Sequence, residues 1–212
     1  MTATLTAIRA ATPDRPPSRL LYAGLLAGPL FVGAFLVEGA LRDGYDPMRH
    51  PVSSLALGPS GWVQVVNFVV AGLLTLLFAA GLRGRRLVAI LVAVWGVGLI
   101  GAGAFVTDPV SGYPAGTPAV ADPATWHGIV HDLAFSLPAF LALTVAMFAD
   151  VRRSRWSALS GVAFLALFVL SSAGFAQAAP FVGVAGLLQR LAIVVGWLWI
   201  AVLARRQLRG RP

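Results

Sequence analysis

The chain has 212 residues, of which 58% are hydrophobic and only 11% are charged. Soluble domains average about 25% charged residues, so this composition excludes an ordinary soluble domain. The net charge of +8 does not indicate a nucleic-acid partner, because the arginines lie in short clusters between apolar segments, and the absence of cysteine excludes disulfides and thiolate metal sites.

Six apolar blocks recur along the chain, each of about 20 residues, which is the length that a helix needs to cross a hydrocarbon core of about 30 Å. Lipid offers the backbone no hydrogen-bond partner, so these blocks must be helices. The sequence therefore predicts an all-α, polytopic membrane protein with six transmembrane helices in one bundle over residues 20–205. The spans are expected at about residues 20–41, 61–82, 87–106, 127–149, 156–176 and 182–204.

Small residues and prolines mark the interior of these spans. Gly24 and Gly28 in the first span predict a close helix contact, as do four glycines in the third span. Pro138 in the fourth span predicts a kink, because proline cannot donate the helical hydrogen bond. The flanking residues 1–19 are expected to form a disordered cytoplasmic tail and 206–212 a basic cytoplasmic tail.

The arginines predict how the chain is oriented in the membrane. Thirteen of them fall before the first span, between spans two and three, between spans four and five, and after the sixth span. By the positive-inside rule both termini are cytoplasmic, and the long connectors at 42–60 and 107–126 face outward. We expect a multi-pass protein of a bacterial plasma membrane, since abundant Ala, Gly, Pro and Arg are typical of GC-rich bacterial genomes.

His127 and His131 begin the fourth span with a spacing of four residues, which places both imidazoles on one helix face. This spacing suits a shared divalent metal, and Asp108 or His50 is the candidate third ligand of a zinc site. The glutamate base of the H-E-x-x-H motif is missing. The alternative is that both histidines lie at the interface and bond to loop carbonyls without any metal.

Two further charges lie where lipid makes them costly. Asp108 precedes a proline at the end of the third span, and is either a structural ion-pair partner or a functional acid. Arg190 lies about 9–12 Å inside the sixth span at about 1.5 Å per residue. It either snorkels outward or is buried as an anion site or ion pair with Glu38 or Asp108.

Three segments resemble a known family. They are R-H-P-V-S-S-L-A-L-G-P-S-G-W-V-Q-V-V-N-F-V-V-A-G (Arg49 to Gly72), F-V-T-D-P (Phe105 to Pro109) and W-H-G-I-V-H (Trp126 to His131). In these segments the chain resembles domain-of-unknown-function family 998, a group of bacterial and archaeal multi-span membrane proteins. The resemblance implies a six-span bundle, no assigned activity and an outward polar signature. The implied signature consists of Ser53, Asn67, Asp108, His127 and His131.

These residues suggest an outward polar pocket between spans two, three, four and six. We expect it to bind a small polar ligand or a lipid head group. The candidate lining residues are Asn67, Asp108, His127, His131, Arg190, His50, Glu38 and Ser53. One alternative is a zinc-dependent hydrolase of a lipid amide or ester, since the His-x-x-x-His pattern is also similar to the seven-span lipid amidases related to alkaline ceramidase. Another is a structural subunit of a membrane complex.

The sequence also predicts a difference between two arginines. Replacing Arg190 by leucine is expected to lower stability more than replacing Arg42, because Arg190 is taken to neutralise a buried acid. Expression level and thermal stability of the two variants would compare them, and equal effects would mean that Arg190 only snorkels.

Overall fold

The computed structural model describes residues 18–210, so residues 1–17 of the predicted N-terminal tail (1–19) and residues 211–212 of the predicted C-terminal tail (206–212) lie outside the described part of the chain. Within residues 18–210 the structure is all helical, with two isolated β-bridges in a connector and no named strand. Six helical segments are long and apolar enough to cross a membrane. They are Arg19–Leu41, Trp62–Gly81, Arg86–Ala104, Trp126–Arg153, Arg155–Phe175 and Val182–Leu208.

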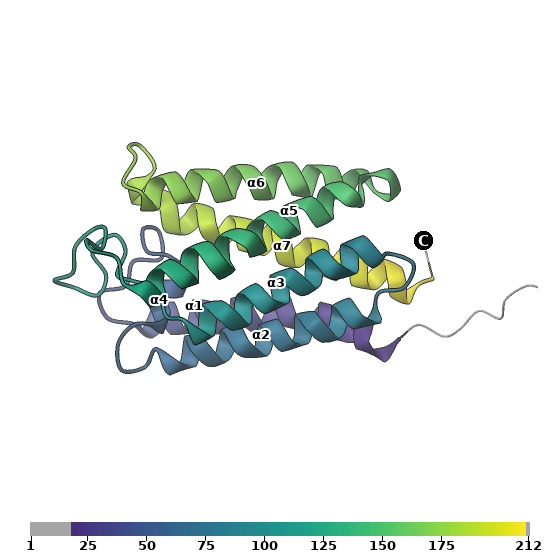
Figure 1. Cartoon of the computed structure of the whole chain (residues 1–212), viewed down its shortest axis with the longest axis horizontal. Coiled ribbons are helices and arrows are strands. Elements are labelled where there is room, and N and C mark those ends of the chain that lie inside the picture. The colour runs from purple at the N-terminus through teal and green to yellow at the C-terminus, as the bar shows by residue number, and fades with distance from the viewer. Residues whose placement is uncertain (1–17, 211–212) are drawn as a thin grey trace, which may run out of the picture.

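The six segments agree with the predicted spans to within a few residues at most ends. The main helices are α1 (Ala23–Leu41), α2 (Trp62–Gly81), α3 (Arg86–Ala104), α4 (Trp126–Ile129), α5 (Leu137–Ala149), α6 (Arg155–Phe175) and α7 (Ala185–Leu208). They run side by side as one elongated bundle (Figure 1). The long connectors at 42–61 and 105–125 gather at one end, which we call the loop end, and the short connectors at 82–85 and 150–154 lie at the arginine-rich end.

The fourth span is irregular, unlike the other long helices. A short α4 continues as a π-helical segment, η3 (Val130–Ser136), and returns to α-helix as α5. Pro138 lies in the first turn of α5. Because proline lacks an N–H and its ring crowds the preceding turn, a wider π-helical turn before it relieves both problems. The sequence predicted a kink at Pro138, and did not single out Pro29, which lies inside α1.

Glycines allow the helices to approach one another closely. A Cβ on Gly72 of α2 would lie 2.7 Å from the carbonyl oxygen of Gly96, and one on Gly96 would lie 3.0 Å from that of Gly72. In α3, Gly98 and Gly101 face the fourth span, where a side chain would collide with Phe135 or Ala139. In lipid the hydrophobic effect does not drive helices together, so close packing at such contacts stabilises the bundle.

A buried polar network joins four helices at the arginine-rich end. Arg85 forms an ion pair with Asp150, and both side chains are almost fully buried. The other Asp150 oxygen accepts a 2.8 Å hydrogen bond from Ser157, whose hydroxyl accepts one of 2.9 Å from the Trp199 indole. Burial lowers the pKa of Arg85, and the Asp150 carboxylate opposes this effect. The pair therefore compensates two charges that would otherwise be costly to bury.

We expect Arg85→Leu to lower the free energy of unfolding by about 3–5 kcal/mol, because it leaves Asp150 buried without its partner. Thermal unfolding in detergent would measure the loss, with exposed Arg152→Leu as the matched control. The double variant Arg85→Leu with Asp150→Leu should recover much of it, since no uncompensated charge remains. An additive loss in the double variant would contradict this account.

Candidate functional site

A cavity of about 330 Å³ lies inside the bundle toward the loop end. Its wall is built from η2 (Val52–Ala56), α3, η3, the start of α5, the end of α6 and the start of α7. Phe31 of α1 and Phe68 of α2 also line the cavity. The sequence expected a pocket among spans two, three, four and six. In the structure α6, the fifth span, also contributes to the cavity.

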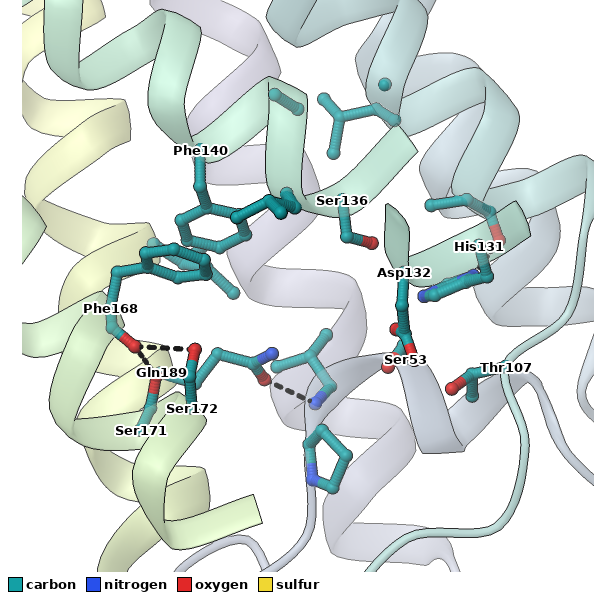
Figure 2. A pocket seen from close by; sticks show the side chains of 18 of the residues that line it. Ser53, Thr107, His131, Asp132, Ser136, Phe140, Phe168, Ser171, Ser172 and Gln189 are labelled. Atoms are coloured by element: carbon teal, nitrogen blue, oxygen red, sulfur yellow. Dashed lines mark hydrogen bonds between the residues drawn. The ribbon is translucent and has the colours of Figure 1, made fainter. Parts of the chain in front are cut away.

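One wall of the cavity is aromatic. Phe140 stacks on Phe168 with ring centroids 4.4 Å apart and an angle of 15° between the rings. Trp95 meets Phe140 edge to face at 5.2 Å. Because such pairs lock one another's orientation, this wall is a preformed apolar surface. Figure 2 shows Phe140 and Phe168 together on the side of the cavity away from His131.

The opposite wall is polar. It carries the side chains of Ser53, Thr107, His131, Asp132 and Ser136 (Figure 2). The last three come from the π-helical segment η3, which changes the direction in which its side chains point relative to a regular helix. π-Helical turns are rare and are found frequently at functional sites. A single irregular segment thus supplies three of the five polar side chains on this wall, while Ser171, Ser172 and Gln189 line the cavity on the side of Phe168.

The cavity reaches the outer surface of the bundle between η3 and α6. Leu133 is 63% exposed and Leu137 is 39% exposed, and both also line the cavity. From the opposite side of the gap comes Ser172, which is exposed as well. In Figure 1, α5 and α6 lie close at the arginine-rich end and diverge toward the loop end. We call this gap the fork.

His131 fixes η3 against the end of α3. Its Nδ1 lies 2.7 Å from the carbonyl oxygen of Phe105 and 3.1 Å from that of Ala102. Both partners are acceptors, so Nδ1 carries the proton. These carbonyls have no helical partner at the C-terminal end of α3, and the imidazole satisfies them. The remaining nitrogen, Nε2, makes no hydrogen bond within residues 18–210.

His127 and Asp108 fasten the second connector to the fourth span. The Asp108 carboxylate accepts hydrogen bonds from the Thr125 N–H at 2.8 Å and the Thr125 hydroxyl at 2.6 Å. That hydroxyl also caps α4 by accepting from the N–H of Gly128, where a Cβ would collide with the carboxylate. His127 Nδ1 lies 3.1 Å from the carbonyl oxygen of Val106. Both residues therefore have a structural role.

The first connector is held by Arg190 of α7. Its guanidinium donates to the carbonyls of His50 and Gly186, at 2.9 Å each, and to the hydroxyl of Tyr45. It is buried, and it stacks over the ring of Phe35 at 5.8 Å. The predicted ion pair with Glu38 or Asp108 is wrong, because neutral groups surround Arg190. Glu38 pairs with Arg42 instead.

Tyr45 and His50 complete this cluster. Burial raises the pKa of Tyr45 to about 12, although the Arg190 guanidinium acts in the opposite direction. The Tyr45 hydroxyl donates to the carbonyl of Pro51 at 2.9 Å. His50 Nδ1 accepts from the N–H of Asp46 at 2.9 Å, so the imidazole is neutral at that nitrogen. The connector is thus a folded cap on the bundle.

The structure brings only some of the predicted site residues together. Ser53 and His131 line the cavity. Asn67 is buried and donates to the carbonyl of Phe31 and to Gln64, at 3.1 Å each. The remaining predicted residues (Asp108, His127, Arg190, His50 and Glu38) make the hydrogen bonds and ion pair described above, away from the cavity lining.

The zinc hypothesis required His127, His131 and either Asp108 or His50 to converge on one point. Among residues 18–210, no group of three or more His, Cys, Asp or Glu side chains could hold a metal ion. The Nδ1 atoms of both fourth-span histidines instead face carbonyl oxygens at the end of α3. The two histidines therefore form hydrogen bonds with backbone carbonyl oxygens, which was the alternative to metal binding.

Sequence reasoning missed Asp132. It lines the cavity from η3 and makes no hydrogen bond or ion pair in the described part of the chain. A signal was present in the sequence, because Asp132 is an acid well inside an apolar span, next to His131. Intramembrane acids mark functional sites by default. The helical spacing of the two histidines drew attention to the helix start instead.

Comparisons with known proteins agree with the fold and add no activity. A family model described as "Protein of unknown function (DUF998)" matches residues 25–206. No curated protein and no solved structure matches the chain. The match begins inside the first span and ends inside the sixth, and every residue that lines the cavity lies within it.

The structure pairs Glu38 with Arg42 and gives Arg190 neutral partners, and this changes the expected order of stability of the Arg42→Leu and Arg190→Leu variants. Arg42→Leu leaves Glu38 buried without its partner and should cost about 3–5 kcal/mol. Arg190→Leu leaves neutral acceptors without a donor, which costs about 1–3 kcal/mol for each unsatisfied group. Because Arg190 donates to three acceptors, we expect the two variants to cost similar amounts in thermal unfolding. Adding Glu38→Gln should rescue Arg42→Leu and leave Arg190→Leu unchanged, and rescue of both would contradict the assignment.

A pH effect follows from His50. Burial lowers its pKa from the ordinary 6.5, so the folded chain resists a proton that the unfolded chain accepts. The stability that neutral His50 contributes is fully present above pH 6.5, the unfolded-state pKa. It is lost as the pH falls from there to the lower pKa of the folded state. Melting temperature measured from about pH 7 to about pH 5 should fall, and less so in His50→Asn, whose Oδ1 can still accept from Asp46. Identical pH profiles would show that His50 does not contribute.

Proposed function

The chain belongs to the family described as "Protein of unknown function (DUF998)", and we propose that its function is to bind an amphipathic ligand in the cavity at the loop end. The polar head of the ligand lies against Ser53, His131 and Ser136, and its apolar part against Phe140 and Phe168. The observation that carries this proposal is that one cavity combines a stacked pair of phenylalanines on one side with a group of polar side chains on the other. Binding sites generally combine a mostly apolar lining with a few placed polar groups.

The size and position of the cavity support a lipid-like ligand. Its volume of about 330 Å³ is at the lower end of the range of about 300–1,000 Å³ for ligand pockets. The fork offers a route from the bilayer, because Leu133 and Leu137 are exposed beside the cavity. A ligand that enters there keeps its apolar part out of water throughout. The proposal thus favours a lipid head group with part of its chain.

The orientation of the cavity is part of the proposal. Arginines at residues 83–86, 152–155 and 205–209 all lie at the end opposite the long connectors. The positive-inside rule places that end in the cytoplasm and the loop end outside. The ligand would then come from the outer leaflet of the plasma membrane or from the external medium. The roles as a metal-dependent hydrolase or as a subunit of a complex stay alternatives that no contact among residues 18–210 supports.

Quenching of tryptophan fluorescence by a probe with a brominated alkyl chain, added to phosphatidylcholine nanodiscs, tests the proposal. Trp95 lines the cavity, and the exposed Trp62, Trp126 and Trp156 can be replaced by phenylalanine to reduce background. We expect quenching that saturates at a low mole fraction of probe, because the site is finite. The additional change Trp95→Phe should remove most of it.

A blocking variant and its control complete this test. Ser136→Phe should fill the cavity and abolish saturable quenching. Leu141→Phe, on the lipid-exposed surface of the same span, should leave it unchanged. Quenching that rises in proportion to the probe in every variant would mean that the probe meets tryptophan only through the bilayer, and the proposed binding function would fail.

A further inference from the structure

Among the acids within the candidate membrane spans of the described chain, Asp132 stands apart. Glu38 and Asp150 each have an arginine partner, and both Asp108 oxygens accept hydrogen bonds from Thr125. Asp132 has no such partner, although it lies in a membrane span and lines the cavity. Its side chain extends from η3 into the region bordered by Ser53 and Thr107 (Figure 2).

The surroundings of Asp132 supply no fixed positive charge. No arginine lines the cavity among residues 18–210, and Arg190 is engaged by carbonyls and by Tyr45. The titratable groups nearest to Asp132 are the imidazole of His131 and the carboxylate of Asp108. The His131 ring is fixed through Nδ1 by the end of α3, and Asp108 adds negative potential. Within the described residues, no side chain that lines the cavity carries a permanent positive charge to balance an ionised Asp132.

Resting on the proposed function, we propose that the cavity selects amphiphiles whose head group is a protonated amine, and that Asp132 receives the ammonium. An ionised carboxylate at membrane depth is costly unless a cation accompanies it, and here the ligand supplies that cation. The hydroxyls of Ser53 and Ser136 make no hydrogen bond within the described residues, so they can accept from the ammonium N–H groups. Phe140 and Phe168 then hold the alkyl chain.

This chemistry has two natural sources, an aminolipid of the bilayer or a free alkylamine. Both present a primary ammonium next to an apolar chain, and the fork accepts entry from the bilayer in either case. Binding is expected to be tighter than for a neutral head by about tenfold, because a charge-assisted hydrogen bond is about twice as strong as a neutral one.

The test compares three brominated dodecyl probes with ammonium, hydroxyl or sulfonate head groups in the nanodisc quenching assay. We expect the ammonium probe to bind about tenfold more tightly than the alcohol, and the sulfonate to bind most weakly. In Asp132→Asn the ratio of ammonium to alcohol affinity should fall to about one. Asp132→Glu should keep a preference for ammonium, and Asp43→Asn, which removes an exposed acid at the loop end, should keep the full ratio.

Equal binding of the three head groups, or an unchanged ratio in Asp132→Asn, would overturn the inference while leaving the binding function in place. Absence of saturable quenching with every head group would overturn the proposed function itself. Thermal unfolding of Asp132→Asn checks that the variant is folded, and Asp132→Glu provides the comparison if it is not. Displacement of the ammonium probe by phosphatidylethanolamine in the nanodisc would identify a bilayer lipid as the source, and its absence would identify a free alkylamine.

Discussion

The imidazole of His131 joins the fourth span to the open end of α3, and the arrangement of the cavity depends on this contact. Hydrocarbon offers no water to the carbonyls of Ala102 and Phe105, so a side chain must satisfy them. The donor, His131, lies in a π-helical segment. In a regular α-helix its side chain would point in a different direction. Once His131 is fixed, the neighbouring Asp132 and, one turn later, Ser136 face the cavity.

The same requirement sorts the polar residues of the bundle into two groups. Most are satisfied within the chain, such as Arg85 with Asp150 at one end and Arg190 with the first connector at the other. These residues hold helices and connectors together and leave little capacity for a ligand. Asp132, Ser53 and Ser136 form the second group, because they border a cavity and lack partners in the described chain. Position and incomplete hydrogen bonding together, more than residue type, separate the ligand-binding candidates from the structural residues.

Hydrophobic length and glycine spacing were enough to predict six helices and their close contacts, since both depend only on local sequence. The partners of individual charges were harder to predict, because they depend on how connectors fold back onto the bundle. Arg190 illustrates this, since its partners in the first connector are 140 and 145 residues away in sequence. The histidine pair was ambiguous for a different reason. A spacing of four residues suits a metal ion and also suits the carbonyls at a helix end, and only the position of α3 decides between them. The π-helical segment broke the assumed periodicity, and so Asp132 went unrecognised.

The divergence of α5 and α6 toward the loop end has a consequence for how occupancy would be controlled. A site reached through the fork exchanges its ligand with the lipid bilayer and not with water. The concentration that matters is therefore that of the ligand within the membrane. Filling of the site would then follow the molar ratio of an amphiphile to the surrounding lipids, however little of it is dissolved in the medium. Such a protein would respond to changes in membrane composition that an aqueous receptor could not register.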